Sequence, residues 1–87
     1  LRQSEGGQLG YRLSKDMDLE IHIYDMFANL IFKDFFYAGG NGGKGDYNKL
    51  DLDLSTFDQF YLSTGVYFYL LIHNGKVLTK GKFAVVP

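Results

Sequence analysis

Four aspartates in the middle of this 87-residue chain could bind a metal ion. Carboxylate oxygens are ligands that Ca²⁺ prefers, and carboxylates two positions apart on a strand project from the same face. The candidate ligands are Asp46, Asp51, Asp53 and Asp58. No Asp-x-Asp-x-Asp-Gly loop accompanies them, and a full set of roughly six to eight oxygen ligands cannot be identified. The competing interpretation is a solvated acidic strand face, so we predict no bound metal and no cofactor.

A glycine-rich segment at residues 38–46, termed the glycine loop below, has some features of a phosphate site. Five of the seven residues from Gly39 to Gly45 are glycine, and Gly39 to Lys44 reads G-x-x-x-G-K. That spacing is one residue short of a phosphate-binding loop, and Gly45 stands where Ser or Thr is required. No helix N-terminus follows to supply a dipole. We therefore predict a mobile loop between two strands.

The two histidines, His22 and His73, are the only imidazoles available for acid–base chemistry or zinc binding. A hydrolytic triad needs a nucleophile, a base and an orienting acid in one pocket. The serines at positions 4, 14, 55 and 63 fall in predicted loops and lack a nucleophile-elbow context. Two histidines without a third ligand motif also make a weak zinc site. We predict that the protein is not an enzyme.

The composition argues against several classes of partner. Nine basic and ten acidic residues give a formal net charge of −1. This charge is a poor match to nucleic acid, although Lys76, Lys80 and Lys82 form a small basic strip, which also suits protection of a sheet edge. The apolar runs are far shorter than the ~20 residues of a membrane helix, so we expect no membrane insertion. Because residue 1 is not methionine, we expect a processed chain or a fragment.

Apolar residues alternate with a period of two, which predicts strands at residues 9–13, 19–24, 30–37, 49–54, 66–73 and 76–86. The segment from Asp25 to Asn29 predicts a tight turn. Asn74 and Gly75 predict a type I′ hairpin turn, and Gly81 predicts a bulge in the last strand. Six or seven strands and no helix predict an all-β, antiparallel two-sheet β-sandwich. We expect one domain at residues 9–87 after a frayed segment at residues 1–8.

Three segments resemble, in order and spacing, the immunoglobulin-like domain of the flagellar hook-capping type. The first is similar to the family's IYD-x-x-G hairpin, the second to its hydrophobic-x-Trp-Asp-Gly strand, and the third to its G-hydrophobic-Y-x-Y strand. These segments are residues 23–31, 47–53 and 65–69. The C-terminal half is also similar to C-terminal sorting domains exported by the type IX secretion system. The sequence departs from the family pattern at Ala28, Leu52, Leu54 and Gln59.

The resemblance covers residues 9–87. It implies an immunoglobulin-like fold in a module without catalysis, appended to a larger bacterial protein. It also implies a secreted or cell-surface location, which no targeting segment in the sequence indicates independently.

The predicted strand at residues 66–73 is apolar on both faces. One row contains Tyr67, Tyr69 and Leu71. The other, termed the outer row below, contains Val66, Phe68, Leu70 and Ile72. A strand of this kind is covered on both sides, either by its own chain or by a partner. The covering side chains within the chain would come from Phe35, Phe36, Phe57, Phe60 and Tyr61. The predicted interface consists of the outer row with Phe57, Phe60 and Tyr61.

Three functions are consistent with these features. The first is a structural or interaction module that acts in assembly, anchoring or sorting of a larger chain, with the parent polypeptide or other copies as partner. The second is a self-assembling subunit or repeat of an extracellular filament or layer, which would use strand donation or edge pairing. The third is a carbohydrate-binding sandwich with Tyr24, Tyr61 and Tyr69 as an aromatic platform, which the absence of tryptophan disfavours.

Overall fold

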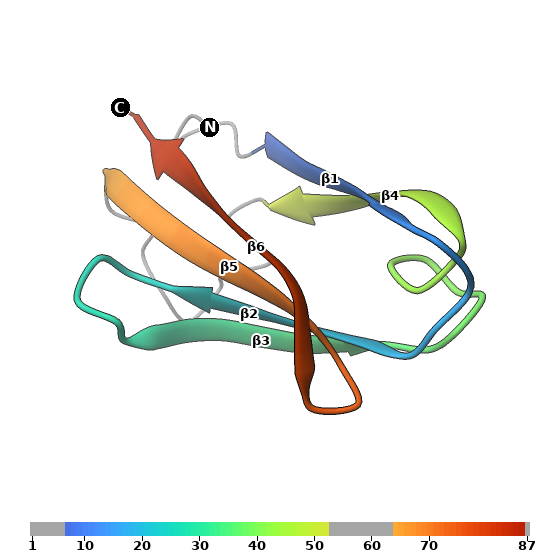
Figure 1. Cartoon of the computed structure of the whole chain (residues 1–87). Coiled ribbons are helices and arrows are strands. Elements are labelled where there is room, and N and C mark those ends of the chain that lie inside the picture. The colour runs from blue at the N-terminus through green and yellow to red at the C-terminus, as the bar shows by residue number, and fades with distance from the viewer. Residues whose placement is uncertain (1–6, 53–63, 87) are drawn as a thin grey trace.

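The computed structural model describes residues 7–52 and 64–86, and this part of the chain contains six strands and no helix. The strands are β1 (Gly7–Leu13), β2 (Leu19–Tyr24), β3 (Leu30–Phe36), β4 (Asp46–Leu52), β5 (Gly65–His73) and β6 (Lys76–Val85). β1 and β4 form a two-stranded sheet, and the other strands form a four-stranded sheet in the order β3-β2-β5-β6. Every pair is antiparallel, and the smaller sheet lies over the larger one in Figure 1. The predicted all-β, antiparallel two-sheet class is confirmed.

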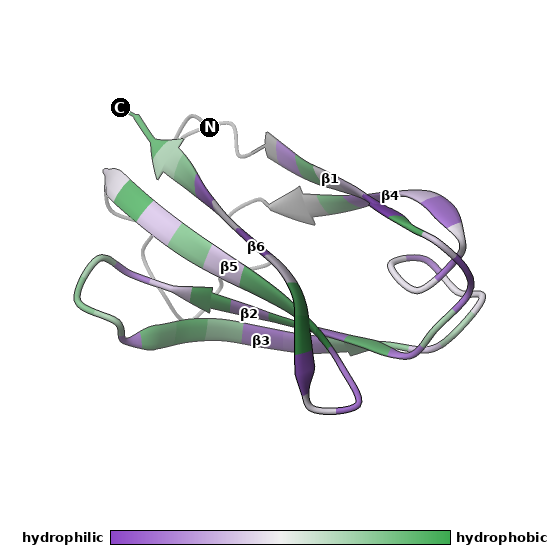
Figure 2. Cartoon of the chain, viewed as in Figure 1, coloured by the Kyte–Doolittle hydropathy of each residue, from purple (hydrophilic) through white to green (hydrophobic). Residues whose placement is uncertain are grey.

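Residues from both sheets share one hydrophobic core. Leu19, Ile21 and Ile23 of β2 are completely buried and alternate with the polar side chains of the same strand. The other core residues are Tyr11, Leu13, Met17, Leu50, Tyr67, Leu71 and Val85. Because strand side chains alternate between faces, each strand in the core has a second face that points away from the other sheet. Figure 2 shows apolar residues along β5 and hydrophilic segments on β2 and β6. No helix in the described residues is long and apolar enough to cross a membrane.

The glycine loop is held by a completely buried amide side chain, that of Asn48 at the start of β4. Its Oδ1 accepts hydrogen bonds from the N–H groups of Gly42 (3.1 Å) and Lys44 (3.3 Å). Its Nδ2 donates to the carbonyl oxygens of Lys44 (2.8 Å) and Asp46 (3.4 Å). The Tyr11 hydroxyl donates to the Gly42 carbonyl at 2.6 Å, and burial raises the pKa of Tyr11 to about 12. The structure therefore shows a hydrogen-bonded loop where the sequence predicts a mobile one.

The glycine loop belongs to the connection from β3 to β4, and it contacts the connection from β1 to β2 at the same end of the molecule (Figure 1). The Met17 N–H, in the connection from β1 to β2, donates to the Gly43 carbonyl at 2.9 Å. A Cβ atom at Gly43 would lie 2.5 Å from the Tyr37 carbonyl oxygen and 2.7 Å from that of Met17. Only glycine permits this close approach of the backbones, so the composition of the loop has a packing explanation.

The predicted strands and turns are largely correct. β1 begins at Gly7, so its first two residues fall in the segment expected to be frayed. The turn after β2 closes with a hydrogen bond from the Asp25 N–H to the Asn29 carbonyl (3.0 Å). Asn74 and Gly75 have φ values of 50° and 77°, as a type I′ turn requires. The predicted connection at residues 55–64 lies outside the described residues except for its last residue.

The predicted bulge at Gly81 is wrong. The register between β5 and β6 shifts between Leu71 and Ile72, whose partners are Thr79 and Val77, while Gly81 pairs regularly with Tyr69. A Cβ atom at Gly81 would lie 2.4–2.6 Å from three atoms of the Tyr69 side chain. The glycine is therefore explained by a cross-strand aromatic ring packed directly over its backbone.

Replacing Asn48 tests the role of the buried amide. We expect Asn48→Ala to lower the free energy of unfolding by about 2 kcal/mol or more, because it leaves buried N–H and C=O groups without partners. Urea denaturation measures the change. Asn48→Asp keeps the acceptor for Gly42 and Lys44 but loses the donor to the Lys44 carbonyl. We therefore expect its change in the free energy of unfolding to differ from that of Asn48→Ala. An Asn48→Ala protein as stable as the wild type would contradict this role.

Substituting Gly81 tests the aromatic contact. We expect Gly81→Ala to destabilise the protein by roughly 1–3 kcal/mol, since the added methyl group forces the Tyr69 ring to move. In a Tyr69→Ala background the same substitution should be neutral or stabilising, because alanine suits a strand better than glycine. A double-mutant cycle in urea measures the coupling. Equal costs of Gly81→Ala in both backgrounds would contradict the contact.

Candidate functional site

The outer row of β5 lies on the face of the four-stranded sheet that points away from the core. Phe68 and Val66 are 45% and 37% exposed, and Leu70 and Ile72 are partly buried. On one side, Phe68 and Leu70 pair with Tyr24 and His22 of β2. On the other side, they pair with Lys82 and Lys80 of β6. Directly paired residues share a face, so the exposed apolar row runs between a polar row and a basic row.

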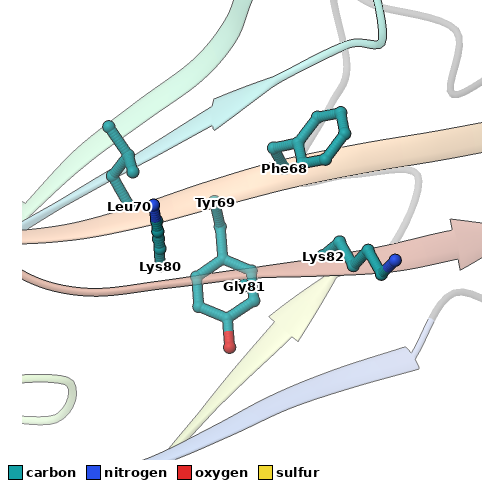
Figure 3. Close-up of a pocket in the computed structure, with 6 residues that line it drawn as sticks. All are labelled: Phe68, Tyr69, Leu70, Lys80, Gly81 and Lys82. Atoms are coloured by element: carbon teal, nitrogen blue, oxygen red, sulfur yellow. The ribbon is translucent and has the colours of Figure 1, made fainter.

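A hollow of about 320 Å³ opens on this face between β5 and β6. Its residues are Phe68, Tyr69, Leu70, Lys80, Gly81 and Lys82. Figure 3 shows Phe68 and Leu70 on one side of the β5 ribbon and the Tyr69 ring on the other, where it passes over Gly81. The paired Tyr69 and Gly81 therefore place no side chain on the outer face, and their backbone forms the floor. The walls are the two apolar side chains and the alkyl stems of the two lysines.

A second hollow, of about 310 Å³, lies on the β2 side of the same two apolar residues. It is lined by Tyr24, Asp25, Met26, Ala28, Phe68 and Leu70. Asp25 fixes the turn that forms its wall, because its Oδ1 accepts hydrogen bonds from the N–H groups of Phe27 and Asn29, each at 2.9 Å. The backbone bond from Asn29, supported by those from its side chain and from Phe27, holds the pKa of Asp25 below its ordinary value.

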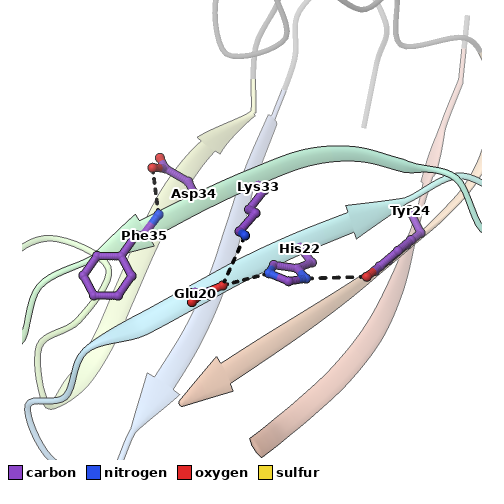
Figure 4. Close-up of polar contacts among 6 residues, drawn as sticks. All are labelled: Glu20, His22, Tyr24, Lys33, Asp34 and Phe35. Atoms are coloured by element: carbon purple, nitrogen blue, oxygen red, sulfur yellow. Dashed lines mark hydrogen bonds and ion pairs between the residues drawn. The ribbon is translucent and has the colours of Figure 1, made fainter. Parts of the chain in front are cut away.

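The polar row on β2 is a chain of contacts (Figure 4). His22 Nε2 lies 2.9 Å from Glu20 Oε2, and Lys33 Nζ lies 3.9 Å from the same oxygen. With the proton on Nε2, His22 Nδ1 accepts from the Tyr24 hydroxyl at 3.5 Å. Both nitrogens of His22 are thus engaged within the sheet. His73 is engaged elsewhere, since its Nδ1 lies 2.7 Å from the Asp18 carbonyl oxygen.

The structure places one of the four predicted calcium ligands. The Asp46 carboxylate forms an exposed ion pair with Arg12 of β1. The side chains of the other three candidates, Asp51, Asp53 and Asp58, lie outside the described part. No group of three or more potential metal-ligating side chains occurs among the described residues.

The two described tyrosines of the predicted glycan platform lie on opposite faces of the larger sheet. Tyr24 pairs with Phe68 on the outer face, whereas Tyr69 pairs with Ile23 on the core face. These two rings cannot form one flat platform, and Tyr61 lies outside the described residues. The predicted platform is therefore wrong for Tyr24 and Tyr69.

Two of the five side chains that were predicted to cover the outer row, Phe35 and Phe36, belong to the described residues. Phe36 packs against the core, and Phe35 is 44% exposed and contacts the ring of Tyr37. Neither side chain buries Phe68. Phe57, Phe60 and Tyr61 lie outside the described residues.

Sequence reasoning missed the turn residues that line the second hollow, above all Met26 and Ala28. Only the pairing of β2 with β5 brings this turn beside Phe68, and no local pattern in the sequence specifies that pairing.

Comparison with known proteins found no matching family model and no significant match to a curated protein or a solved structure.

The Asp25 turn predicts a pH dependence. Because the pKa of Asp25 is depressed in the folded state, its carboxylate stabilises the fold at pH values above its ordinary pKa of about 4. This contribution is lost as the pH falls through the pKa of the folded state. We therefore expect Asp25→Asn to be destabilising at pH 7 and to lose this difference in acid. Urea denaturation across a pH series measures it. An Asp25 carboxyl that titrates at or above its ordinary value by NMR would contradict the expectation.

Proposed function

We propose that this chain is a non-catalytic interaction module with an immunoglobulin-like β-sandwich fold. In this proposal it belongs to a bacterial secreted or cell-surface protein and acts in the assembly, anchoring or sorting of a larger chain. The two antiparallel sheets with a shared core support the fold. The sequence motifs quoted above support the family and the location.

The observation that carries the interaction role is the exposed outer row. An apolar strand face on which Phe68 and Val66 stay 45% and 37% exposed resembles the centre of a protein interface, where aromatic and aliphatic side chains are buried by a partner. Phe68 is the natural anchor, because it stands between two hollows and presents the largest side chain of the row.

Self-assembly into a filament or layer is the second candidate. It would use the same exposed row, with another copy of the chain as partner. Light scattering coupled to size exclusion, over a concentration series, separates the two. Growth in mass that Phe68→Ser abolishes favours self-assembly, and a constant monomer mass favours a different partner.

Site-specific photo-cross-linking tests the interaction role directly. A benzophenone amino acid replaces Phe68 in the protein within the cells that produce it, and Tyr37, which is 76% exposed at the other end of β3, serves as the matched aromatic control. We expect irradiation to give an adduct of defined mass from position 68 and none from position 37. Leu70→Ser should reduce its yield, because it removes the neighbouring apolar contact.

The absence of an adduct at position 68, or equal adducts at both positions, would contradict the interaction role. Fractionation of the same cells tests the location. Recovery of the protein from the cytoplasmic fraction alone would contradict the secreted or surface placement.

A further inference from the structure

The charges on the outer face are unevenly compensated. On the β2 side, Glu20 contacts His22 and Lys33, and the Asp25 carboxylate accepts hydrogen bonds from its own turn. On the β6 side, Lys80 and Lys82 are exposed, and no carboxylate of the described residues forms an ion pair with either. Among the residues that the structure describes, the uncompensated charge beside the exposed apolar row is therefore positive.

This positive charge borders an apolar hollow. The two lysines extend along the rim while Phe68 and Leu70 form its wall (Figure 3). A ligand that fills the hollow with an apolar group meets an ammonium group on either side of it. Such an arrangement favours an apolar group flanked by anionic groups, since charge complementarity selects partners and fixes their register.

We propose that the partner presents an acidic, extended protein segment to this face, with one apolar side chain in the hollow and carboxylates beside Lys80 and Lys82. This inference rests on the proposed interaction role and names the chemistry of its partner. An extended chain suits the site because its side chains alternate, so that one apolar side chain can enter the hollow while its neighbours lie beside the two lysines. The second hollow is lined in part by the Asp25 carboxylate, so the acidic segment is placed on the β6 side of Phe68 and Leu70.

A second copy is a poorer occupant. Within residues 7–52 and 64–86, the acidic groups that border the apolar row on its outer face are Glu20 and Asp25, and both are already engaged within their own chain. Pairing two such faces would bring the lysines of one copy against groups that gain little from them. A partner with free carboxylates avoids this cost.

NMR titration of the full ¹⁵N-labelled chain tests the proposal with synthetic peptides. The probe is acetyl-Ser-Glu-Leu-Glu-Leu-Glu-Ser-amide, and the comparison peptides carry Lys for each Glu or Ser for each Leu. We expect the acidic apolar peptide alone to shift the amide signals of Phe68, Leu70, Lys80 and Lys82. Its affinity should fall as salt rises, because the contacts are exposed ion pairs.

Charge substitutions provide the matched control. We expect Lys80→Gln with Lys82→Gln to weaken binding about fivefold to tenfold, the effect of two exposed charge pairs. Lys44→Gln with Lys49→Gln makes the same change in net charge on exposed residues near β4, and should leave binding unchanged. Phe68→Ser and, as an independent variant, Leu70→Gln should each abolish the shifts.

The outcomes separate this proposal from the one on which it rests. Loss of binding in Phe68→Ser but not in the double-lysine variant would overturn the acidic partner and leave the interaction role standing. Equal binding of acidic and basic peptides would also overturn the acidic partner. The chain could instead sediment with vesicles of phosphatidylcholine and phosphatidylserine, lose this binding in the double-lysine variant, and bind no peptide. That result would assign the face to a lipid surface. A dimer that Phe68→Ser abolishes would assign it to a second copy.

Discussion

The arrangement of the two sheets depends on the hydrogen bonds of one buried amide. Asn48 is completely buried, and its side chain both accepts from and donates to the backbone of the glycine loop. A buried polar group is tolerated only when it is fully paired, so this amide permits essentially one conformation of the loop. The loop in turn contacts the β1–β2 connection through Met17. Both connections between the sheets at this end are thereby fixed by the same group.

Fixing the two sheets against each other decides which face of β5 is available. Once β1 and β4 cover the larger sheet, Tyr67 and Leu71 enter the shared core. The side-chain period of two then forces the outer row to the opposite face, whatever its polarity. A shift of one residue would bury the outer row but would expose the core row, which is equally apolar. The exposed apolar surface is therefore a consequence of a strand that has no polar face to turn outward.

Local patterns predicted much of the fold. The alternation at residues 19–24 and the Asn74–Gly75 pair were sufficient, because strand faces and type I′ turns depend on neighbours in the sequence. The order of the glycine loop was missed, since it depends on an asparagine in the next strand and a tyrosine 31 residues away from Gly42. Gly81 was misread for the same reason, because its partner ring belongs to β5. The apolar character of the outer row was visible in the sequence, but its exposure was left open there, and the hollows beside it follow only from strand order.

The two faces of β5 contribute unequally to the stability of the fold. The core face of β5 contributes buried side chains such as Tyr67 and Leu71, whereas Phe68 on the outer face keeps 45% of its surface exposed. Burial in the core supplies most of the free energy of folding, so the outer face is only weakly constrained by it. A partly exposed phenylalanine between two hollows has no comparable role in holding the sheets together. The core therefore does not account for the exposed part of this row, which lies beside two lysines that form no ion pair with a carboxylate of the described residues.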